Sequence, residues 1–270
     1  MTPVTRPELP PPSEIEEALG WLAEHAHENL GTEIALRAAA TSRAPDVNLA
    51  RRADSSLAGV SVSSPGGQWF LEADTPDATA DLVGGVAGAA GSTRRWPTKI
   101  TTSGEVKPWV RPLLGARSVA PVREHDLLAM ACRKPPGGGE GRWANPADRA
   151  ALERYQALYN AERRTSISPD WESVLGRRAV AVLEEDGRIV AVVKRSADTA
   201  QYATIGGTWT DPEQRGRGRA KRLTAFLVAE ILQERPAVHL VVDDDNAAAI
   251  ALYRSLDFEE IGGCYMGYLQ

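Results

Sequence analysis

The sequence is poor in the residues that build disulfide frameworks and metal centres. Its 270 residues include two cysteines and four histidines. The cysteines, Cys132 and Cys264, lie far apart and form no C-x-x-C motif, and the histidines lack the spacing of zinc ligands. We therefore interpret these residues as isolated core or surface positions and expect no metal site.

Long apolar runs are also missing. No segment approaches the length of a membrane span, and the first residues, MTPVTRPELPPP, lack the apolar core of a secretion signal. The formal net charge of -5 argues against nucleic acid as a general partner. The sequence thus predicts a cytoplasmic protein that acts on neither a membrane nor a nucleic acid.

The most informative stretch is a basic loop and the helix that follows it. Residues 208–232 read TWTDPEQRGRGRAKRLTAFLVAEIL, which predicts a strand end, a turn at Asp211-Pro212, a loop with two glycines, and a helix. The first N–H groups of a helix have no intrahelical partner and carry partial positive charge, so they favour phosphate. Five cationic residues within 215–222 suit a pyrophosphate better than one carboxylate. Taken alone, such a loop is weak evidence for phosphate binding, because Gly-rich basic turns also occur as plain solvated linkers.

Two sequence motifs, which follow each other in the order of a known family, favour phosphate binding over a plain linker. Arg215-x-x-Gly218-x-Ala220 matches the R/Q-x-x-G-x-G/A loop with which the GNAT superfamily of acyltransferases holds the pyrophosphate of acetyl-CoA. Residues 243–258, DDDNAAAIALYRSLDF, resemble the second half of that cofactor site, where an Asn opens a helix that carries an inward Tyr. Residues 141–270 therefore resemble a GNAT domain, an α/β fold with a mixed sheet.

The resemblance implies an acetyl donor, an amine acceptor and a strand edge that binds the pantetheine arm of the donor. Acetyl-CoA would be the acyl-donor co-substrate, and a small-molecule or peptide amine would accept the acetyl group. In the family the pantetheine arm lies along the fourth strand where it splays from the fifth, and a backbone N–H there stabilises the oxyanion. Gly206-Gly207 fits a β-bulge or a close backbone approach at this edge, or a strand irregularity without functional weight. The residues implied in cofactor binding are Thr208, Trp209, Thr210, Arg215, Gly216, Arg217, Gly218, Arg219, Ala220 and Asn246.

The resemblance also makes Tyr253 the candidate general acid for the departing thiolate. Tyr253 follows Asn246 by seven residues, so a helix begun at Asn246 places both on roughly the same face. Packing in the core beside Ile250 and Leu256 is the alternative for Tyr253. Asn246 is a good helix N-cap under either interpretation.

No residue can be assigned as the general base. Amino-terminal acetyltransferases of ribosomal proteins, which the Asn-to-Tyr helix resembles, carry a Glu where this sequence has Val241. Histone-type members place a Glu on the strand that corresponds here to 201–210, which contains no acid. Asp243, a water chain, or proton loss from a weakly basic amine all remain open. The three acids 243–245 do not form a calcium loop, because alanines occupy positions where an EF-hand requires an oxygen ligand and glycine.

The rest of the C-terminal half fits the GNAT order of elements. Loops at 163–169 and 262–265 would set the acceptor. The predicted elements are a strand at 141–144, a helix from Asn145-Pro146 to about 162, a shorter helix after Pro169, a hairpin over 179–194, a strand at 201–210, the helix after Gly218, a strand at 238–242, the Asn246 helix, and two strands at 259–261 and 265–269.

The N-terminal half predicts a second α/β domain. Residues 1–12 form a Pro-rich tail that we expect to be disordered, and a capping box at Ser13 opens a helix that ends near Gly31. A hairpin, a helix after Thr75-Pro76, a strand, a helix and further strands follow in GNAT-like order. Where a phosphate loop should stand, the sequence reads Asp-Thr-Pro-Asp. Residues 13–134 are therefore a degenerate, non-catalytic GNAT-like domain or an unrelated α/β module.

Residues 135–140, PPGGGE, are the most linker-like stretch, and 141–270 is the predicted catalytic domain. A long loop within one domain is the alternative. Two functions follow from the sequence: an acetyl-CoA-dependent N-acetyltransferase that works by direct transfer in a ternary complex, or a non-catalytic protein that senses acyl-CoA.

Overall fold

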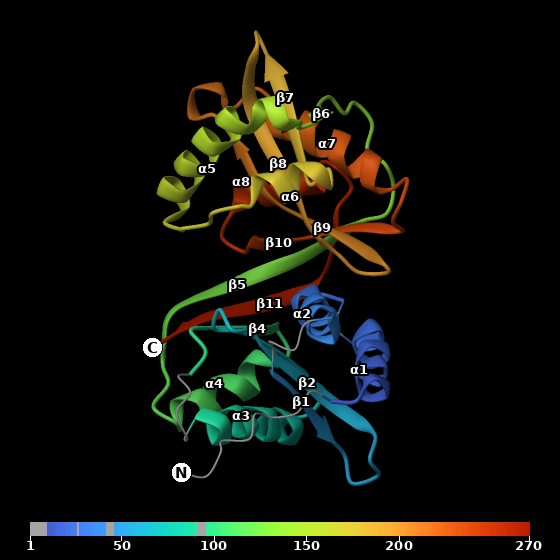
Figure 1. Ribbon diagram of the computed structural model, residues 1–270, viewed down its shortest axis with the longest axis vertical. Coiled ribbons are helices and arrows are strands. Elements are labelled where there is room, and N and C mark those ends of the chain that lie inside the picture. The colour runs from blue at the N-terminus through green and yellow to red at the C-terminus, as the bar shows by residue number, and fades with distance from the viewer. Residues whose placement is uncertain (1–9, 26, 42–45, 91–95) are drawn as a thin grey trace. The chain divides into compact units, whose positions relative to one another are not determined.

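The computed structural model describes residues 10–25, 27–41, 46–90 and 96–270 (Figure 1). The chain forms two compact units. Unit 1 comprises Met1–Ala129, Val241–Asp245 and Glu260–Gln270, and unit 2 comprises Met130–Leu240 and Asn246–Glu259. Most of the predicted tail at 1–12 lies outside the described residues. No helix within the described ranges is long and apolar enough to cross a membrane.

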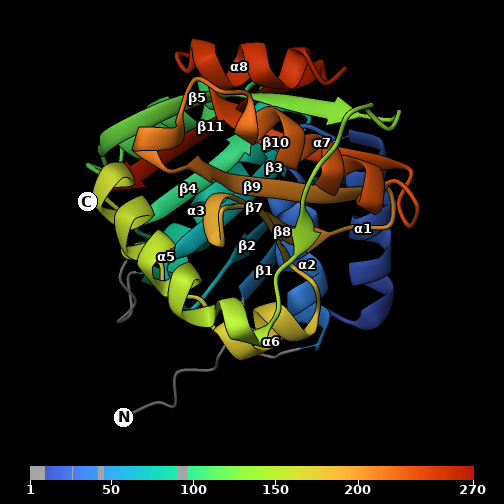
Figure 2. The same cartoon turned by 90° about the horizontal axis from the view of Figure 1, so that it is seen from above.

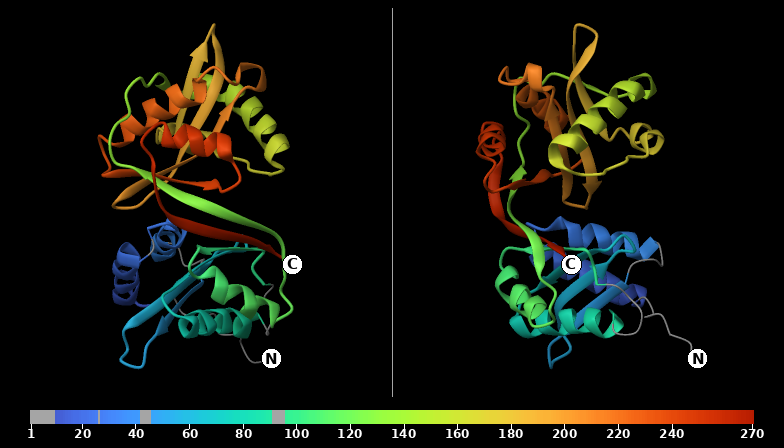
Figure 3. Two further views of the ribbon diagram at one scale, coloured as in Figure 1. Left: turned by 180° about the vertical axis from the view of Figure 1, so that it is seen from behind. Right: turned by 90° about the vertical axis from the view of Figure 1, so that its left-hand side faces the viewer.

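Unit 1 is a sheet covered by a pair of helices on each face. Helices α1 and α2 pack on one face, where Leu22, Leu36, Val60 and Val62 form a buried cluster. Helices α3 and α4 cover the other face, over Trp69, Leu71 and Ile100 (Figure 3). The strand order is β1-β2-β3-β4-β11, and β3 and β4 run parallel. The elements are α1 (Pro12–His25), α2 (Leu30–Thr41), β1 (Asp46–Arg51), β2 (Leu57–Ser63), β3 (Gln68–Ala73), α3 (Pro76–Ala90), β4 (Lys99–Ser103), α4 (Lys107–Gly115), β5 (Pro121–Cys132) and β11 (Glu259–Leu269).

Unit 2 has the same architecture. Its strands follow the order β10-β9-β8-β7-β6, with β9 and β10 parallel. Helices α5 and α6 cover one face, and α7 and α8 lie on the opposite side (Figures 2 and 3). The elements are β6 (Arg142–Trp143), a short 3-10 turn (Pro146–Asp148), α5 (Arg149–Arg163), α6 (Trp171–Gly176), β7 (Val180–Glu185), β8 (Arg188–Asp198), β9 (Tyr202–Thr210), a second 3-10 turn (Pro212–Gln214), α7 (Arg219–Ile231), β10 (Ala237–Asp243) and α8 (Ala247–Arg254). Both units are α/β with mixed strands, as predicted.

The last strand of the sequence belongs to unit 1. Strand β11 pairs antiparallel with β4 from Cys264 opposite Ser103 to Tyr268 opposite Lys99. Its Tyr265 is fully buried in the core of unit 1. The division therefore differs from the predicted one, in which all of 141–270 formed one domain. Hydrogen bonding along β4 and the packing of this tyrosine assign 260–270 to the N-terminal unit.

The predicted linker at 135–140 is packed against α7. Gly139 lies so close to the helix that a Cβ atom there would stand 2.6 Å from the backbone N of Phe226. The next residue, Glu140, donates its N–H to the carbonyl of Arg222 at 3.0 Å. Because glycine lets the backbone approach a helix this closely, the run of glycines builds a contact within unit 2.

Two other element predictions were wrong. The first predicted helix, expected to end near Gly31, is two helices, since α1 ends at His25 and α2 begins at Leu30. The two strands predicted at 259–261 and 265–269 are one continuous strand, β11, so the acceptor loop expected at 262–265 is not a loop. The remaining helices and strands of unit 2 follow the predicted order.

Candidate active site

The N-terminus of α7 has no side-chain cap. Gly218 is its N-cap residue with φ 72°, and Gly216 in the preceding loop has φ 75°. Both values lie in the left-handed region that glycine adopts without strain. The first backbone bond at this end runs from the N–H of Arg222 to the carbonyl of Gly218 at 3.0 Å. The amides before Arg222 are therefore available to a ligand, as the sequence predicted.

Three of the five cationic residues in 215–222 form ion pairs within the unit, and two form none with the residues that the structure describes. Arg219 is buried and binds Glu185 and the carbonyl of Gln214, which lies 3.1 Å from its Nη1. Arg222 pairs with Glu140 and with Glu185, and these contacts hold the loop and α7 in place.

Arg215 belongs to the same structural group. Its Nε donates to the carbonyl of Thr210 at 3.1 Å, and its Nη2 lies 2.6 Å from a carboxylate oxygen of Glu162 on α5. Among the described residues, Arg217 and Lys221 form no ion pair. Arg215, Arg219 and Arg222 thus have carboxylate partners within the unit, and the predicted roles of Arg215 and Arg219 in cofactor binding stay predictions.

Strand β9 separates from β10 next to this loop. The two strands pair at three positions, from Tyr202 opposite Ala237 to Thr204 opposite His239, whereas β9 continues to Thr210. Beyond the last pair, this edge of β9 is not bonded to β10. The predicted splay between the fourth and fifth strands of the fold is therefore present.

A β-bulge lies on β9 within this splayed part. Val192 of β8 stands opposite Trp209, and Lys194 stands opposite Gly206, so one residue of β8 faces two of β9. Gly207, with φ 60°, is one of the two. Its carbonyl accepts a hydrogen bond from Tyr155 Oη at 3.0 Å. The register shift thus includes Gly207 and begins next to Gly206, and its functional weight stays a prediction.

Tyr253 of α8 reaches this bulge. Its ring is buried, and its hydroxyl lies 3.3 Å from Thr208 Oγ1. Burial raises the pKa of the Tyr253 phenol, and the hydrogen bond with Thr208 opposes this only in part. The phenol therefore stays protonated at neutral pH, which is the state that a proton donor requires.

The other residues of the predicted site lie on the same elements. Trp209 is buried against Tyr155, and its indole N–H donates to Glu162 at 3.2 Å, so its side chain is part of the core. Thr210 is buried, and its hydroxyl has no partner among the described residues. Ala220 is half-buried in the first turn of α7. Asn246 is the N-cap of α8 and accepts from the N–H of Ala249 at 3.2 Å.

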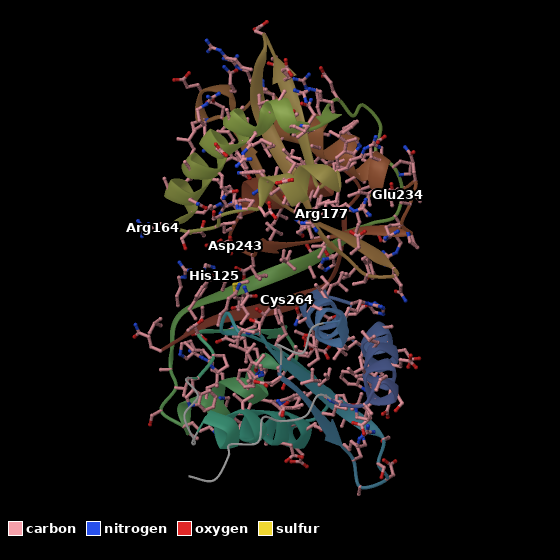
Figure 4. The ribbon with its side chains drawn as sticks, viewed as in Figure 1. His125, Arg164, Arg177, Glu234, Asp243 and Cys264 are labelled. Atoms are coloured by element: carbon pink, nitrogen blue, oxygen red, sulfur yellow. The ribbon has the colours of Figure 1, made fainter. Side chains whose placement is uncertain are left out.

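Asp243, one of the open choices for a base, lies with its partner in unit 1. Its Oδ1 lies 3.1 Å from Nδ1 of His125 (Figure 4). The acceptor loop predicted at 163–169 is exposed and begins with Arg164 in the left-handed region at φ 52°. Among the described residues, no cluster of three or more His, Cys, Asp or Glu side chains could hold a metal ion.

Sequence reasoning missed an aromatic cluster on the α5 and α6 side of the bulge. The Lys194 ammonium of β8 lies 5.0 Å from the ring centre of Tyr155, 5.8 Å from that of Tyr159 and 5.6 Å from that of Trp171. A lysine at the end of the apolar run IVAVV is the signal that could have pointed to it.

Comparison with known proteins gives the family. The family model described as Acetyltransferase (GNAT) family matches residues 145–258. A mycothiol acetyltransferase of Kocuria rhizophila is 43% identical over 65 residues, which are 24% of this chain and 22% of that protein. An acetyltransferase of Pectobacterium atrosepticum is 30% identical over 111 residues, which are 39% of this chain and 70% of the relative.

Solved structures of similar fold span both units. A GCN5-related N-acetyltransferase from Sphaerobacter thermophilus has a TM-score of 0.66 at 19% identity, covering 96% of this chain and 93% of its own. A tandem GNAT protein from the clavulanic acid biosynthesis pathway has a TM-score of 0.54 at 15% identity, covering 96% and 97%. At these identities the two structures show the fold alone. The family model over 145–258, and the Pectobacterium relative of which this chain covers 70% at 30% identity, show that the chain belongs to the acetyltransferase (GNAT) family.

Proposed function

We propose that the chain is an acetyl-CoA-dependent N-acetyltransferase that moves the acetyl group to a primary amine by direct attack in a ternary complex. The observation that carries the proposal is the uncapped N-terminus of α7 in the same unit as the Tyr253 phenol at the β9 bulge. The proposed acceptor is a small-molecule or peptide amine.

The residues present fit the proposed donor. Free amides at Gly218 and the first turn of α7, together with Arg217 and Lys221, would hold the pyrophosphate. The unpaired edge of β9 from Thr208 to Thr210 would bind the pantetheine arm as an added strand does. Acetyl-CoA would supply the acetyl thioester, and the chain's own part is to hold it and to handle charge and protons.

The proposed chemistry uses two features of unit 2. A backbone N–H of β9 beyond the bulge would donate to the carbonyl oxygen as negative charge develops on it. The Tyr253 phenol, kept protonated by burial and held by Thr208, would donate its proton to the departing thiolate. The attacking amine loses its proton to a base, and the new C–N bond replaces the C–S bond.

Calorimetry of acetyl-CoA binding tests the donor site. The double variant Arg217→Glu with Gly218→Glu puts two negative charges where the phosphates would sit. We expect its affinity for acetyl-CoA to fall on the order of 100-fold or more, because charge-assisted hydrogen bonds are lost and repulsion is added.

The matched control is Gly176→Glu with Arg177→Glu, the same pair of changes at the exposed end of α6. It should bind acetyl-CoA as the wild type does, and circular dichroism checks that both variants fold. Equal affinity in the two double variants would contradict the donor site.

Release of free thiol from acetyl-CoA over a panel of primary amines tests the reaction. Turnover with at least one amine supports a transferase. Tight acetyl-CoA binding without thiol release for any alkylamine, amino-acid amide or amino-terminal peptide would instead favour an acyl-CoA sensor.

A further inference from the structure

Lys194 of β8 occupies an unusual position for a lysine. Its side chain is half-buried, and its ammonium lies among the rings of Tyr155, Tyr159 and Trp171. Among the described residues no carboxylate lies within ion-pair distance of it. A charge removed from water without an anion is costly, even where aromatic rings offset part of the loss. An ion pair therefore does not account for the lysine.

The surroundings of Lys194 favour the neutral amine more than those of a surface lysine do. Desolvation lowers the pKa of Lys194 to about 8. The facing groups from α5 are the phenols of Tyr155 and Tyr159 and the amide of Gln156, whose Oε1 accepts from Nζ at 2.5 Å. α6 contributes the uncharged Trp171. A neutral amine keeps N–H groups for Gln156 and gains a lone pair, so both forms can make this hydrogen bond.

The flanking strands bring no charged partner to this lysine. Lys194 stands opposite Val180 of β7 and Gly206 of β9 in the sheet. Its two strand neighbours are thus apolar or without a side chain. The groups that set its protonation are those of α5 and α6 together with its partial exclusion from water.

Lys194 also lies beside the β9 bulge, where the proposed function places the reaction. The space next to the Gly207 Cα is bounded by Lys194 Cδ, 3.5 Å from an ideal Cβ, and by Tyr155 Oη, also at 3.5 Å. The next residue, Thr208, contacts the Tyr253 hydroxyl. The Tyr159 phenol acts electrostatically on the pKa of Tyr253 and lies beside Lys194, so the two ends of this cluster share a neighbour.

We propose that the neutral Lys194 side chain accepts the proton that the acceptor ammonium must lose before it attacks the thioester. The inference rests on the proposed function and names the base that the sequence left open. The proton moves from the acceptor nitrogen to Nζ, and the freed electron pair forms the C–N bond. The C–S bond breaks, and the thiolate takes the proton of Tyr253, whose phenolate is reprotonated by the new amide nitrogen as it loses its remaining extra proton. Lys194 later releases its proton to water, so that one proton is produced for each acetyl group transferred.

The test compares Lys194→Arg, Lys194→Met and the wild type in the full chain. Arginine keeps the charge and the contacts with the rings but stays protonated in proteins, and methionine keeps only the stem. Thiol release is measured from pH 6 to 10 with saturating acetyl-CoA and the amine that the wild type uses best. We expect kcat of the wild type to rise as the pH passes through about 8. Both variants should lose about 100-fold or more in kcat at pH 7.5, and with it that rise, because the base is gone.

A matched lysine in unit 1 provides the control. Lys99 is also desolvated, which lowers its pKa, and its ammonium lies 5.7 Å from the ring centre of Tyr268. Lys99→Arg should leave kcat and its pH profile unchanged. Acetyl-CoA affinity of the Lys194 variants should stay within about twofold of the wild type, since the lysine is placed with the acceptor and not with the phosphates. Acceptors of weaker basicity should suffer smaller losses, because they need less help to lose a proton.

The outcomes separate this inference from the proposed function. A Lys194→Arg variant that keeps the rate and the pH profile would overturn the base role and leave the transferase intact. A variant with normal kcat and a raised KM for the amine would also overturn it, because the lysine would then bind the acceptor. Absence of thiol release by the wild type with every amine would overturn the transferase, and the inference with it. Rates of trace acetylation of Lys194 by acetic anhydride, followed by mass spectrometry across pH, report its titration without turnover and should show a midpoint near 8.

Discussion

The two units have the same order of elements, but they differ at the N-terminus of one helix, which is α3 in unit 1 and α7 in unit 2. In each, two helices precede three strands, a helix, a strand and a further helix. The hydroxyl of Thr75 caps α3 by accepting from the N–H of Ala78 at 3.2 Å, and Pro76 occupies the first turn. At the corresponding end of α7, Gly218 supplies no side chain. Unit 1 satisfies the N–H of Ala78 at this helix end with its own side chain, whereas no side chain caps the corresponding end in unit 2.

The splayed strands differ in the same way. The parallel strands β3 and β4 of unit 1 also pair at three positions, ending with Phe70 opposite Thr101. Beyond that point the buried Glu72 accepts hydrogen bonds from the backbone N–H of Ser103 at 2.9 Å and from the side-chain amide of Asn29. The same strand order thus has two different fillings: in unit 1 a buried carboxylate forms hydrogen bonds across the gap, and in unit 2 Gly207 and the Tyr253 phenol lie there, where we propose that the donor binds.

The largest expected effect comes from removing the phenol of unit 2. Tyr253→Phe should lower kcat by about 100- to 1,000-fold while acetyl-CoA affinity stays the same, because only the proton donor is lost. Thiol release and calorimetry measure the two quantities. Because burial raises the pKa of this phenol, loss of wild-type activity through its ionisation should begin only above the ordinary range near pH 10.

Tyr265→Phe is the matched change in unit 1, where the hydroxyl donates to Glu124 at 2.6 Å. It should leave kcat unaltered if the contrast between the units is correct. A kcat for Tyr253→Phe within about twofold of the wild type would contradict the proton-donor role and leave Tyr253 with a packing role only.

A smaller effect, on the free energy of unfolding, is expected from replacing Glu72, the carboxyl between the strands of unit 1. Burial raises the pKa of Glu72 to about 8. Between the ordinary carboxyl pKa near 4.3 and that value, the unfolded chain loses its proton and the folded chain keeps it, so the free energy of unfolding falls as the pH rises. Glu72→Gln should remove this loss, which is on the order of a few kcal/mol, and stabilise the protein at pH 9 relative to the wild type.

Urea unfolding at pH 4.5 and pH 9 measures the change. Glutamine keeps the acceptor oxygen that Ser103 and Asn29 use, so the variant should be close to the wild type at the lower pH. If the free energy of unfolding depends on pH equally in both proteins, Glu72 is ionised in the folded state. A protonated carboxyl would then not be what fills the gap between the strands of unit 1.

The smallest effect concerns the cap itself. Thr75→Ala should cost about 1 kcal/mol of unfolding free energy, because one amide of α3 loses its acceptor. Thr75→Ser should restore most of it. Neither change should alter acetyl-CoA affinity by calorimetry, and a loss of affinity in Thr75→Ala would mean that the end of α3 takes part in binding.

Local patterns in the sequence predicted what local physics decides. The loop before α7 was predictable because its glycines and cations lie within a few residues of the helix start. The proximity of Tyr253 to Thr208 followed only from the family resemblance, since the two lie 45 residues apart. The capping role of Asn246 was predictable from its position alone.

The misses are long-range. Arg215 and Arg219 bind Glu162 and Glu185, whose positions in the sequence give no sign of the contact. The sequence showed 265–269 to be a strand, but strand patterns do not name a partner, and β11 joined β4 of the other unit. Lys194 needed α5 and α6 in place before its aromatic surroundings existed.

The place of β11 has a consequence for the order in which the protein is made. Unit 1 begins at the N-terminal side of the sequence, yet the strand that hydrogen-bonds to β4 is made only after all of unit 2. A chain that ends at Glu259 therefore holds every residue of the second unit but an incomplete first unit, which lacks the partner strand of β4 and the buried Tyr265. Chains truncated after Glu259 should expose their earlier half to protease and protect their later half.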